Sequence, residues 1–172
     1  MREVDIPKAI VGLSGTMLDL GSGMGQVAKY FKNFKITAVD KDRESLDQLF
    51  INLRGYDVKT VLSDIRDYKI DTNYDVIVCA NVLHFLKKEE PPGIIKNIQE
   101  HTKIGGLNII SGFTINGELK SPNFFQKGEL KNYYSGHKIL HYEESVVDVY
   151  ERHTDGSNKS HELAFIIAKK VS

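Results

Sequence analysis

Three glycines at alternate positions stand directly after a short apolar run that carries one acidic residue. Residues 18–25 read LDLGSGMG, with Asp19 two positions before Gly21 and with Gly23 and Gly25 following. Glycine has no Cβ, so the backbone can take a positive φ and a ligand can approach its N–H groups closely. The stretch is compatible with a nucleotide-binding loop and also with a plain tight turn.

Two further aspartates end the next two apolar runs of the sequence. Asp40 stands 21 residues after Asp19, and Asp64 ends the run after that. In dinucleotide-binding folds an acidic side chain at about this interval reaches the ribose hydroxyls. Each aspartate taken singly could equally be a helix cap or a turn former. Three acidic residues on successive apolar runs favour a ligand that contains a ribose.

The spacing of the glycines bears on which nucleotide-like ligand would fit. A dinucleotide fingerprint reads G-x-G-x-x-G, but here the third glycine comes one residue early and Gln26 stands at the last position. The G-x-x-x-x-G-K-[ST] sequence of ATP-binding loops is absent. The pattern therefore disfavours NAD and ATP.

Other reactive side chains give weaker signals. Cys79 is the one cysteine and lies in the apolar run YDVIVCA, which predicts a buried, inert thiol. The six histidines show no metal-ligand spacing, so we predict no metal site. With 23 basic and 23 acidic residues the formal net charge is zero, which argues against a nucleic-acid partner.

The elements that would position these residues alternate between strands and helices. Short apolar runs predict buried strands, and segments with apolar residues at helical spacing predict helices. The predicted strands are 16–21, 35–40, 56–64, 74–81 and 107–113. The predicted helices are 26–33, 44–55 with Leu46, Leu49, Phe50 and Leu53 on one apolar face, and 91–102 stopped by Gly105-Gly106. This alternation predicts parallel pairing through right-handed crossovers.

The rhythm changes after Phe113. One helix is predicted at KGELKNYY, residues 127–134, and two β-rich segments at 137–152 and 160–170 flank the turn TDGSN. These segments predict an antiparallel hairpin that completes the sheet. The expected fold is a doubly wound α/β domain with a seven-stranded, mostly parallel sheet.

Length and composition bound the remaining expectations. A chain of 172 residues is expected to form a single domain, residues 1–172. Residues 1–15 are expected to be a short N-terminal extension. Residues 114–172 are expected to complete the sheet and a pocket for a second ligand. No secretory or membrane-spanning run is found, which favours a soluble, cytoplasmic protein without a membrane partner. We expect a monomer or a homodimer.

The loop DLGSGMG, with its acidic residue two positions before the first glycine, resembles class I S-adenosylmethionine-dependent methyltransferases. The resemblance runs from about Thr16 to the C-terminus. It implies that S-adenosylmethionine is the cofactor and S-adenosylhomocysteine the product. By position it assigns the methionine moiety to the loop and the ribose to Asp40, with Asp64 and Ile65 framing the adenine. The residues implied to bind the cofactor are Asp19, Gly21, Ser22, Gly23, Gly25, Asp40, Lys41, Asp64, Ile65, Ala80, Asn81 and Val82.

The segment YDVIVCANVLHFL resembles the motif at the cofactor's edge in the same family, which is why Ala80, Asn81 and Val82 are included. His84 would face the same region. It is the catalytic candidate for an acceptor that must lose a proton, although a packing or hydrogen-bonding role is the stronger interpretation.

A narrower resemblance covers PNFFQKGELKNYYSG, residues 122–136, which is similar to the tellurite-resistance methyltransferase TehB family. It implies a small-molecule methyl acceptor, such as a tellurite or selenite oxyanion, held by basic or N–H donors. His84, His137, Arg152 and His153 are the candidates, with Tyr133 and Tyr134 as pocket wall or helix packing. Bacterial members carry a His-Arg pair on the penultimate strand, where Tyr150-Glu151 stands here. A domain that binds the cofactor with lost or different activity is the alternative.

Overall fold

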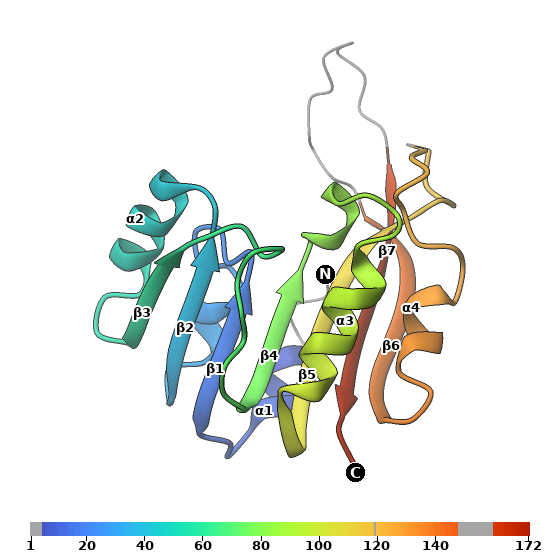
Figure 1. Ribbon diagram of the computed structural model, residues 1–172. Helices are drawn as coiled ribbons and strands as arrows, with labels where there is room; N and C mark the ends of the chain where they lie inside the picture. The colour runs from blue at the N-terminus through green and yellow to red at the C-terminus, as the bar shows by residue number, and fades with distance from the viewer. Residues whose placement is uncertain (1–4, 119, 148–159) are drawn as a thin grey trace.

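The computed structural model of the chain describes residues 5–118, 120–147 and 160–172. Its centre is a seven-stranded sheet with the strand order β3-β2-β1-β4-β5-β7-β6. The strands from β3 to β5 pair in parallel, whereas β7 pairs antiparallel with both β5 and β6. The sheet runs from β3 at the left of Figure 1 to β6 at the right. The predicted doubly wound α/β fold with an antiparallel C-terminal hairpin is confirmed.

The strands and helices follow the predicted alternation. The strands are β1 (Gly15–Leu20), β2 (Phe34–Asp40), β3 (Asp57–Leu62), β4 (Tyr74–Ala80), β5 (Thr102–Thr114), β6 (Lys138–Val147) and β7 (His161–Lys169). The α-helices are α1 (Asp5–Ile10), α2 (Arg43–Asn52), α3 (Pro91–Glu100) and α4 (Glu129–Tyr133), and the 3₁₀ helices are η1 (Ala28–Tyr30) and η2 (Leu83–Phe85). None of the helices in the described ranges is long and apolar enough to cross a bilayer. The predicted turn at 154–158 lies outside the described residues.

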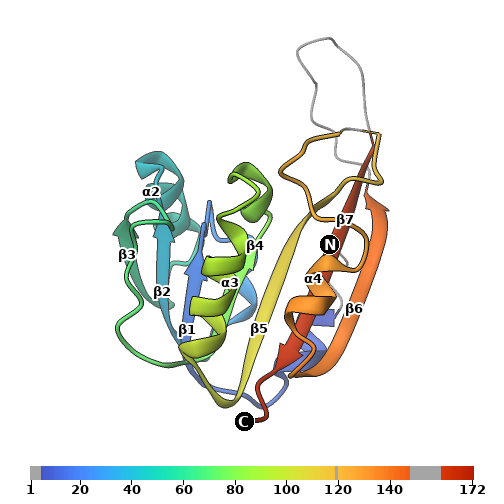
Figure 2. The same cartoon turned by 45° about the vertical axis from the view of Figure 1, so that its right-hand side comes forward.

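Helices cover both faces of the sheet. One apolar cluster joins α3 and α4 to the sheet through Ile95, Ile98 and Leu130. The other joins α1, η1 and α2 to the opposite face, with Ile6 and Leu49 among its members. Figure 2 shows α3 and α4 in front of the sheet and α1 behind it. Burial on both faces explains why the central strands are nearly continuous apolar runs.

Strand β4 shows how this two-sided burial acts on single residues. Val76 and Val78 pack in the cluster with α1 and α2, whereas Ile77 and Cys79 pack in the cluster with α3 and α4. Cys79 is fully buried, and burial raises the pKa of its thiol. The prediction that this thiol is buried is confirmed.

The helix predicted for residues 26–33 is wrong, because only the short 3₁₀ helix η1 forms there. The N–H of Phe31 donates to the carbonyl of Ala28, and the N–H of Phe34 donates to that of Phe31, each three residues back. The rings of Phe31 and Phe34 are buried edge to face with centroids 5.2 Å apart. Packing of both rings turns the chain into β2 before an α-helix can develop.

The prediction that the Gly105-Gly106 pair ends the preceding helix is wrong. Helix α3 ends at Glu100, and both glycines lie inside β5, which starts earlier than expected. A Cβ on Gly106 would lie 2.7 Å from the carbonyl oxygen of Asp75 on the neighbouring strand. The glycine is therefore needed for close strand packing.

Helix α1 lies within residues 1–15, the segment expected to form a short N-terminal extension. The prediction for one residue of α2 is wrong. Phe50 was placed on the apolar face of its helix, but it is 63% exposed, while Leu46, Leu49 and Leu53 are buried. Helix α2 contacts β2 and β3 at the edge of the sheet, where the apolar surface is narrow.

Tyr134 provides a test of the core. Its side chain is fully buried against the sheet, and its hydroxyl has no hydrogen-bond partner among the described residues. An unpaired buried hydroxyl costs about 1–3 kcal/mol. Tyr134→Phe is therefore expected to raise the free energy of unfolding by about 1 kcal/mol, measured by urea denaturation. A loss of stability would mean that the hydroxyl is paired in solution.

Candidate functional site

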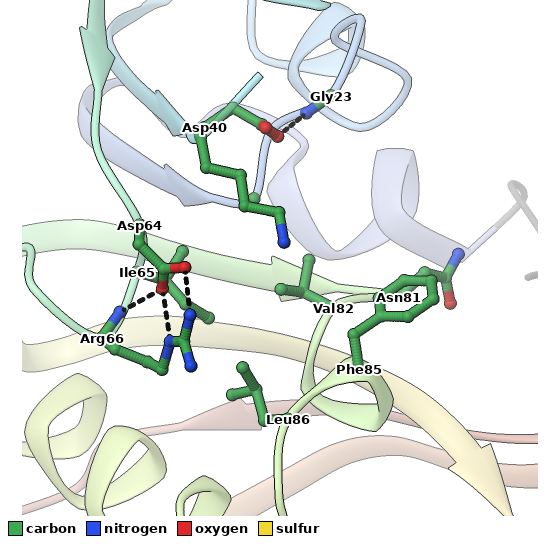
Figure 3. Close-up of a pocket in the computed structure, with 11 residues that line it drawn as sticks. Gly23, Asp40, Asp64, Ile65, Arg66, Asn81, Val82, Phe85 and Leu86 are labelled. Carbon is green, nitrogen blue, oxygen red and sulfur yellow. Dashed lines mark hydrogen bonds and ion pairs between the residues drawn. The ribbon is translucent and has the colours of Figure 1, made fainter.

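A cleft opens beyond the carboxyl ends of β1, β2 and β4. It consists of two adjoining cavities of about 310 and 440 Å³ that share Gly21, Gly23 and Asn81. We call them the Asp40 lobe and the Asp19 lobe. The Asp40 lobe is also lined by Asp40, Lys41, Asp64, Ile65, Arg66, Val82, Phe85 and Leu86 (Figure 3). The Asp19 lobe is also lined by Asp19, Ser22, Gln26, Val27, Tyr30 and Ala80. Ligands of open α/β sheets bind at this place.

The glycine loop between β1 and η1 forms the floor shared by both lobes. The N–H groups of Gly21 and Ser22 both donate to the carbonyl of Val39, at 2.8 and 3.0 Å. Gly21 has a φ of +72°, and a Cβ there would lie 2.2 Å from a methyl carbon of Val82. The loop thus needs glycine both for its backbone angle and for its close contact with Val82, two residues after the end of β4.

Asp40 ties the loop to the end of β2. Its carboxylate accepts hydrogen bonds from the N–H of Gly23 at 2.8 Å and from that of Asp42 at 2.9 Å, and Figure 3 shows the bond to Gly23. A carboxylate has about four acceptor sites on two oxygens. Asp40 therefore keeps acceptor capacity for the hydroxyls of a ligand in the lobe it lines.

Asp64 is held by a residue two positions later. The guanidinium of Arg66 donates to both carboxylate oxygens, at 2.9 and 2.7 Å, and the Arg66 N–H donates at 3.0 Å. These bonds lower the pKa of Asp64 to about 2. Figure 3 shows the pair at one wall of the lobe. The wall thus presents a fixed, flat guanidinium beside an ionised carboxylate.

Two polar residues that line the Asp19 lobe are buried. Asp19 is 3% exposed and Ser22 is 5% exposed. Within the described ranges, neither Asp19 Oδ2 nor Ser22 Oγ has a hydrogen-bond partner. Burial, and secondly the charge of Asp40, raise the pKa of Asp19 to about 7. An acceptor and a hydroxyl in the lining of one lobe, both without a partner among the described residues, mark a place suited to a polar ligand.

Asn81 links the two lobes and has an unusual backbone. Its φ is +59°, which is uncommon for residues other than glycine. Its N–H donates to the carbonyl and the hydroxyl oxygen of Ser111, and its side-chain oxygen accepts from that hydroxyl at 2.9 Å. These bonds from β5 hold Asn81 in a strained conformation that turns the chain around the cleft.

His84 lies beside the cleft and lines neither lobe. It is 6% exposed and stacks on Phe113 with ring centroids 4.0 Å apart. Burial, and secondly the nearby His161, lower its pKa to about 4. The ring is therefore neutral near pH 7, and its Nδ1 has no hydrogen-bond partner in the part of the chain that is described.

Most residues singled out in the sequence gather at the cleft. Gly25 does not line it and packs instead near Leu49 and Leu53. The sequence did not reveal Gln26, Val27, Tyr30, Arg66, Phe85 or Leu86 as lining residues. Gln26, Val27 and Tyr30 belong to the segment that was wrongly predicted to be a helix. The sequence therefore could not show which residues of this segment face the cleft. Phe85 is 74% exposed in the structure. In the sequence, its position near the predicted site residues Ala80, Asn81 and Val82 was the signal that could have indicated its role.

The acceptor candidates further along the chain do not converge on the described cleft. Tyr134 is packed in the core, and the Tyr133 hydroxyl donates to Glu129. The ring of His137 contacts Tyr134 edge to face. Arg152 and His153 lie outside the described residues. No group of three or more His, Cys, Asp or Glu side chains suited to a metal occurs in the described ranges.

Comparison with known proteins assigns the family. The family profile described as "Tellurite resistance protein TehB" matches residues 3–167. The chain belongs to the TehB family. The match spans nearly the whole chain and includes every residue that lines the cleft.

Individual relatives agree with this membership. The "Probable S-adenosyl-L-methionine-dependent methyltransferase TehB" of Haemophilus influenzae (strain 10810) is 33% identical over 164 residues, 90% of this chain and 57% of that protein. The crystal structure of TehB from Haemophilus influenzae superposes with a TM-score of 0.85 at 31% identity, covering 97% of this chain and 60% of the other. The chain thus spans less than two thirds of the length of these relatives.

A more distant structure shares the fold alone. The N-methyltransferase NodS from Bradyrhizobium japonicum WM9, in complex with S-adenosyl-l-homocysteine, superposes with a TM-score of 0.71 at 10% identity. The superposition covers 99% of this chain and 88% of NodS. NodS thus shares the overall fold of this chain.

Proposed function

We propose that the chain is an S-adenosylmethionine-dependent methyltransferase that acts on a small molecule. The observation that carries the proposal is a pair of buried groups without partners in the described ranges, Asp19 Oδ2 and Ser22 Oγ, in a lobe that adjoins the lobe containing Asp40. An amino acid bears an ammonium and a carboxylate, which need an acceptor and a donor respectively. A nucleoside attached to an amino acid therefore matches the two lobes. The Haemophilus influenzae relative, named a probable S-adenosyl-L-methionine-dependent methyltransferase, supports the same ligand.

In this proposal the Asp19 lobe holds the methionine moiety. The Asp19 carboxylate accepts from the ammonium, the Ser22 hydroxyl donates to the carboxylate, and Ala80 flanks the chain between them. Gly21 and Gly23 allow close approach of the ligand to the loop backbone. Binding an ammonium also stabilises the ionised form of Asp19, whose pKa burial raises to about 7.

The Asp40 lobe holds the adenosine. Asp40 accepts from the ribose hydroxyls with the capacity left beside its bonds to Gly23 and Asp42. Apolar side chains of Ile65 and Val82 face the adenine ring, with the backbone of Asn81 beneath it. Lys41 and the paired Asp64 complete the rim.

The chemistry of the site then requires little acid or base catalysis. When bound, S-adenosylmethionine supplies a methyl group on a sulfonium, which an acceptor lone pair can attack in line. The protein's task is to hold donor and acceptor at near-attack distance and to exclude water. Asn81, fixed by Ser111, and the glycine loop are the rigid parts that set this geometry.

The acceptor is proposed to be a small molecule, with tellurite or selenite as first candidates because of the family description. An oxyanion presents a lone pair that needs no deprotonation, so a neutral His84 would not limit its methylation. Action without nucleic acid or membrane, a cytoplasmic location, and a monomeric or homodimeric state stay predictions.

An acceptor screen tests the function. The purified chain is mixed with S-adenosylmethionine and with tellurite, selenite or a panel of thiols, and the release of S-adenosylhomocysteine is measured. We expect release that depends on at least one acceptor. Binding of the cofactor with no turnover on any acceptor would favour the alternative of a cofactor-binding domain with lost activity.

His84 is proposed to pack the wall beside the acceptor. If packing is its role, His84→Phe keeps the stack on Phe113 and lowers kcat/KM less than about tenfold, whereas His84→Ala lowers it further. A general base contributes about 10²–10⁴-fold, so its loss would make both variants equally poor. Steady-state kinetics with an acceptor found in the screen separates the two outcomes.

A further inference from the structure

The segment 122–136, which carries the narrower resemblance to the TehB family, is tied by one lysine to the chain that follows η2. The ammonium of Lys88 donates to the Glu129 carboxylate at 2.5 Å and to the carbonyl of Phe124 at 3.0 Å. It also lies 5.6 Å from the centroid of the Phe125 ring. One side chain thus makes three contacts with a segment that is distant in sequence.

Glu129 also accepts hydrogen bonds from residues of its own segment. Its carboxylate accepts from the N–H of Gln126 at 2.7 Å and from the hydroxyl of Tyr133 at 2.9 Å, besides the bond from Lys88. Burial acts to raise the pKa of Glu129, but the hydrogen bonds outweigh it and hold the pKa below its usual value. The carboxylate is therefore ionised and fixed near neutral pH.

Lys88 follows closely in sequence on two residues that line the cleft. Phe85 and Leu86 line the Asp40 lobe and precede Lys88 by three and two positions. The N–H groups of Phe85 and Leu86 bond only three residues back, to Val82 and Leu83. Such local bonds shape η2 but do not fix where it lies over the sheet.

A ring contact joins the same two segments. The ring of Phe124 meets His84 edge to face at 6.1 Å and meets Phe113 edge to face at 5.6 Å. Phe124 is also the residue whose carbonyl accepts from Lys88. The ion pair and the ring contact therefore act together on the position of η2.

We propose that Lys88 and Glu129 are positioning residues that hold η2, and with it the wall formed by Phe85 and Leu86, against the Asp40 lobe. The proposal rests on the proposed function in so far as this lobe binds adenosine. Since η2 and the segment 122–136 are distant in sequence, the position of this wall depends on the contacts that join the two segments. Neither residue touches the proposed cofactor; both act through η2.

Calorimetry with S-adenosylhomocysteine and with adenosine tests the positioning role. Glu129→Gln and Lys88→Met are expected to lower the affinity for both ligands by about tenfold, because the displaced wall belongs to the lobe that both ligands occupy. The double variant should be no weaker than the poorer single variant, since each change breaks the same link. Lys88→Arg, which keeps a cation, is expected to restore most of the affinity.

The pair formed by Lys96 and Glu100 provides the matched control. Its charged atoms are 3.9 Å apart on the exposed surface of α3, away from the cleft. Glu100→Gln removes a carboxylate as Glu129→Gln does, and it is expected to leave both affinities within about twofold of wild type. Equal effects of the two changes, or unchanged affinity in Glu129→Gln, would overturn the proposal.

A ligand-free readout keeps the test independent of the proposed function. The chain contains no tryptophan, so Phe85→Trp, at a side chain that is 74% exposed, introduces a single tryptophan on η2 whose emission can be excited apart from that of the eight tyrosines. In that background Glu129→Gln should lower the fluorescence anisotropy and raise acrylamide quenching, whereas Glu100→Gln should change neither. Failure of wild type to bind S-adenosylhomocysteine would contradict the function, while an unmoved reporter would contradict the positioning role.

Discussion

Replacing Gly21 with alanine is expected to reduce binding of S-adenosylhomocysteine by at least about 100-fold. The added Cβ would lie 2.2 Å from a methyl carbon of Val82, and the backbone there has a φ of +72°. Together the strain and the overlap cost several kcal/mol, on the order of 3, which corresponds to about 100-fold in affinity where the loop must keep its shape. Calorimetry on the variant measures the loss.

Gly12 supplies the matched control for this change. It has the same φ of +72°, but a Cβ there would meet no atom within 4 Å. Gly12→Ala thus carries the backbone strain without the clash and lies outside the cleft. It should bind the ligand within about twofold of wild type. Addition of Val82→Ala to Gly21→Ala removes the methyl carbons that the added Cβ would meet and should recover part of the lost affinity. No recovery would show that the clash is not the cause.

Asp19→Asn is expected to lower the affinity for S-adenosylhomocysteine and to stabilise the ligand-free protein at pH 8. Burial raises the pKa of Asp19 from 3.8 to about 7. Its contribution to stability is therefore present below about pH 3.8 and is lost as the pH rises through about 7, a change on the order of 4 kcal/mol. Asparagine avoids the buried charge, so the melting temperature at pH 8 should rise, while the ammonium of the ligand loses its counter-charge.

The pH dependence of binding follows from the same group. An ammonium is bound best by ionised Asp19, so the affinity of wild type should rise about tenfold between pH 6 and pH 8. Asp19→Asn should show a flat profile over that range. A flat profile in wild type, or a steep one in the variant, would show that another group controls binding.

The outline of the fold could be predicted because its signals are local and repeated. Buried strands such as β4 are continuous apolar runs, and helix α3 begins with prolines at its first positions. The segment after the glycine loop could not be predicted in this way. Its form depends on how Phe31 and Phe34 pack together, which is a tertiary contact.

The cleft shows the same division between local and distant signals. Asp19, Asp40 and Asp64 could be found because parallel strands bring their carboxyl ends to one edge, whatever the details of packing. The pairing of Asp64 with Arg66 and the strained turn at Asn81 could not, since each depends on side-chain geometry. The contact between Lys88 and Glu129 joins segments 41 residues apart and has no local sequence pattern.

Calorimetric titration of the wild-type chain with S-adenosylhomocysteine tests the central claim most directly. We predict one bound molecule per chain with micromolar affinity, and loss of that binding in Gly21→Ala but not in Gly12→Ala. A folded wild-type chain that binds neither S-adenosylhomocysteine nor S-adenosylmethionine at millimolar concentration would contradict the assignment of the cleft.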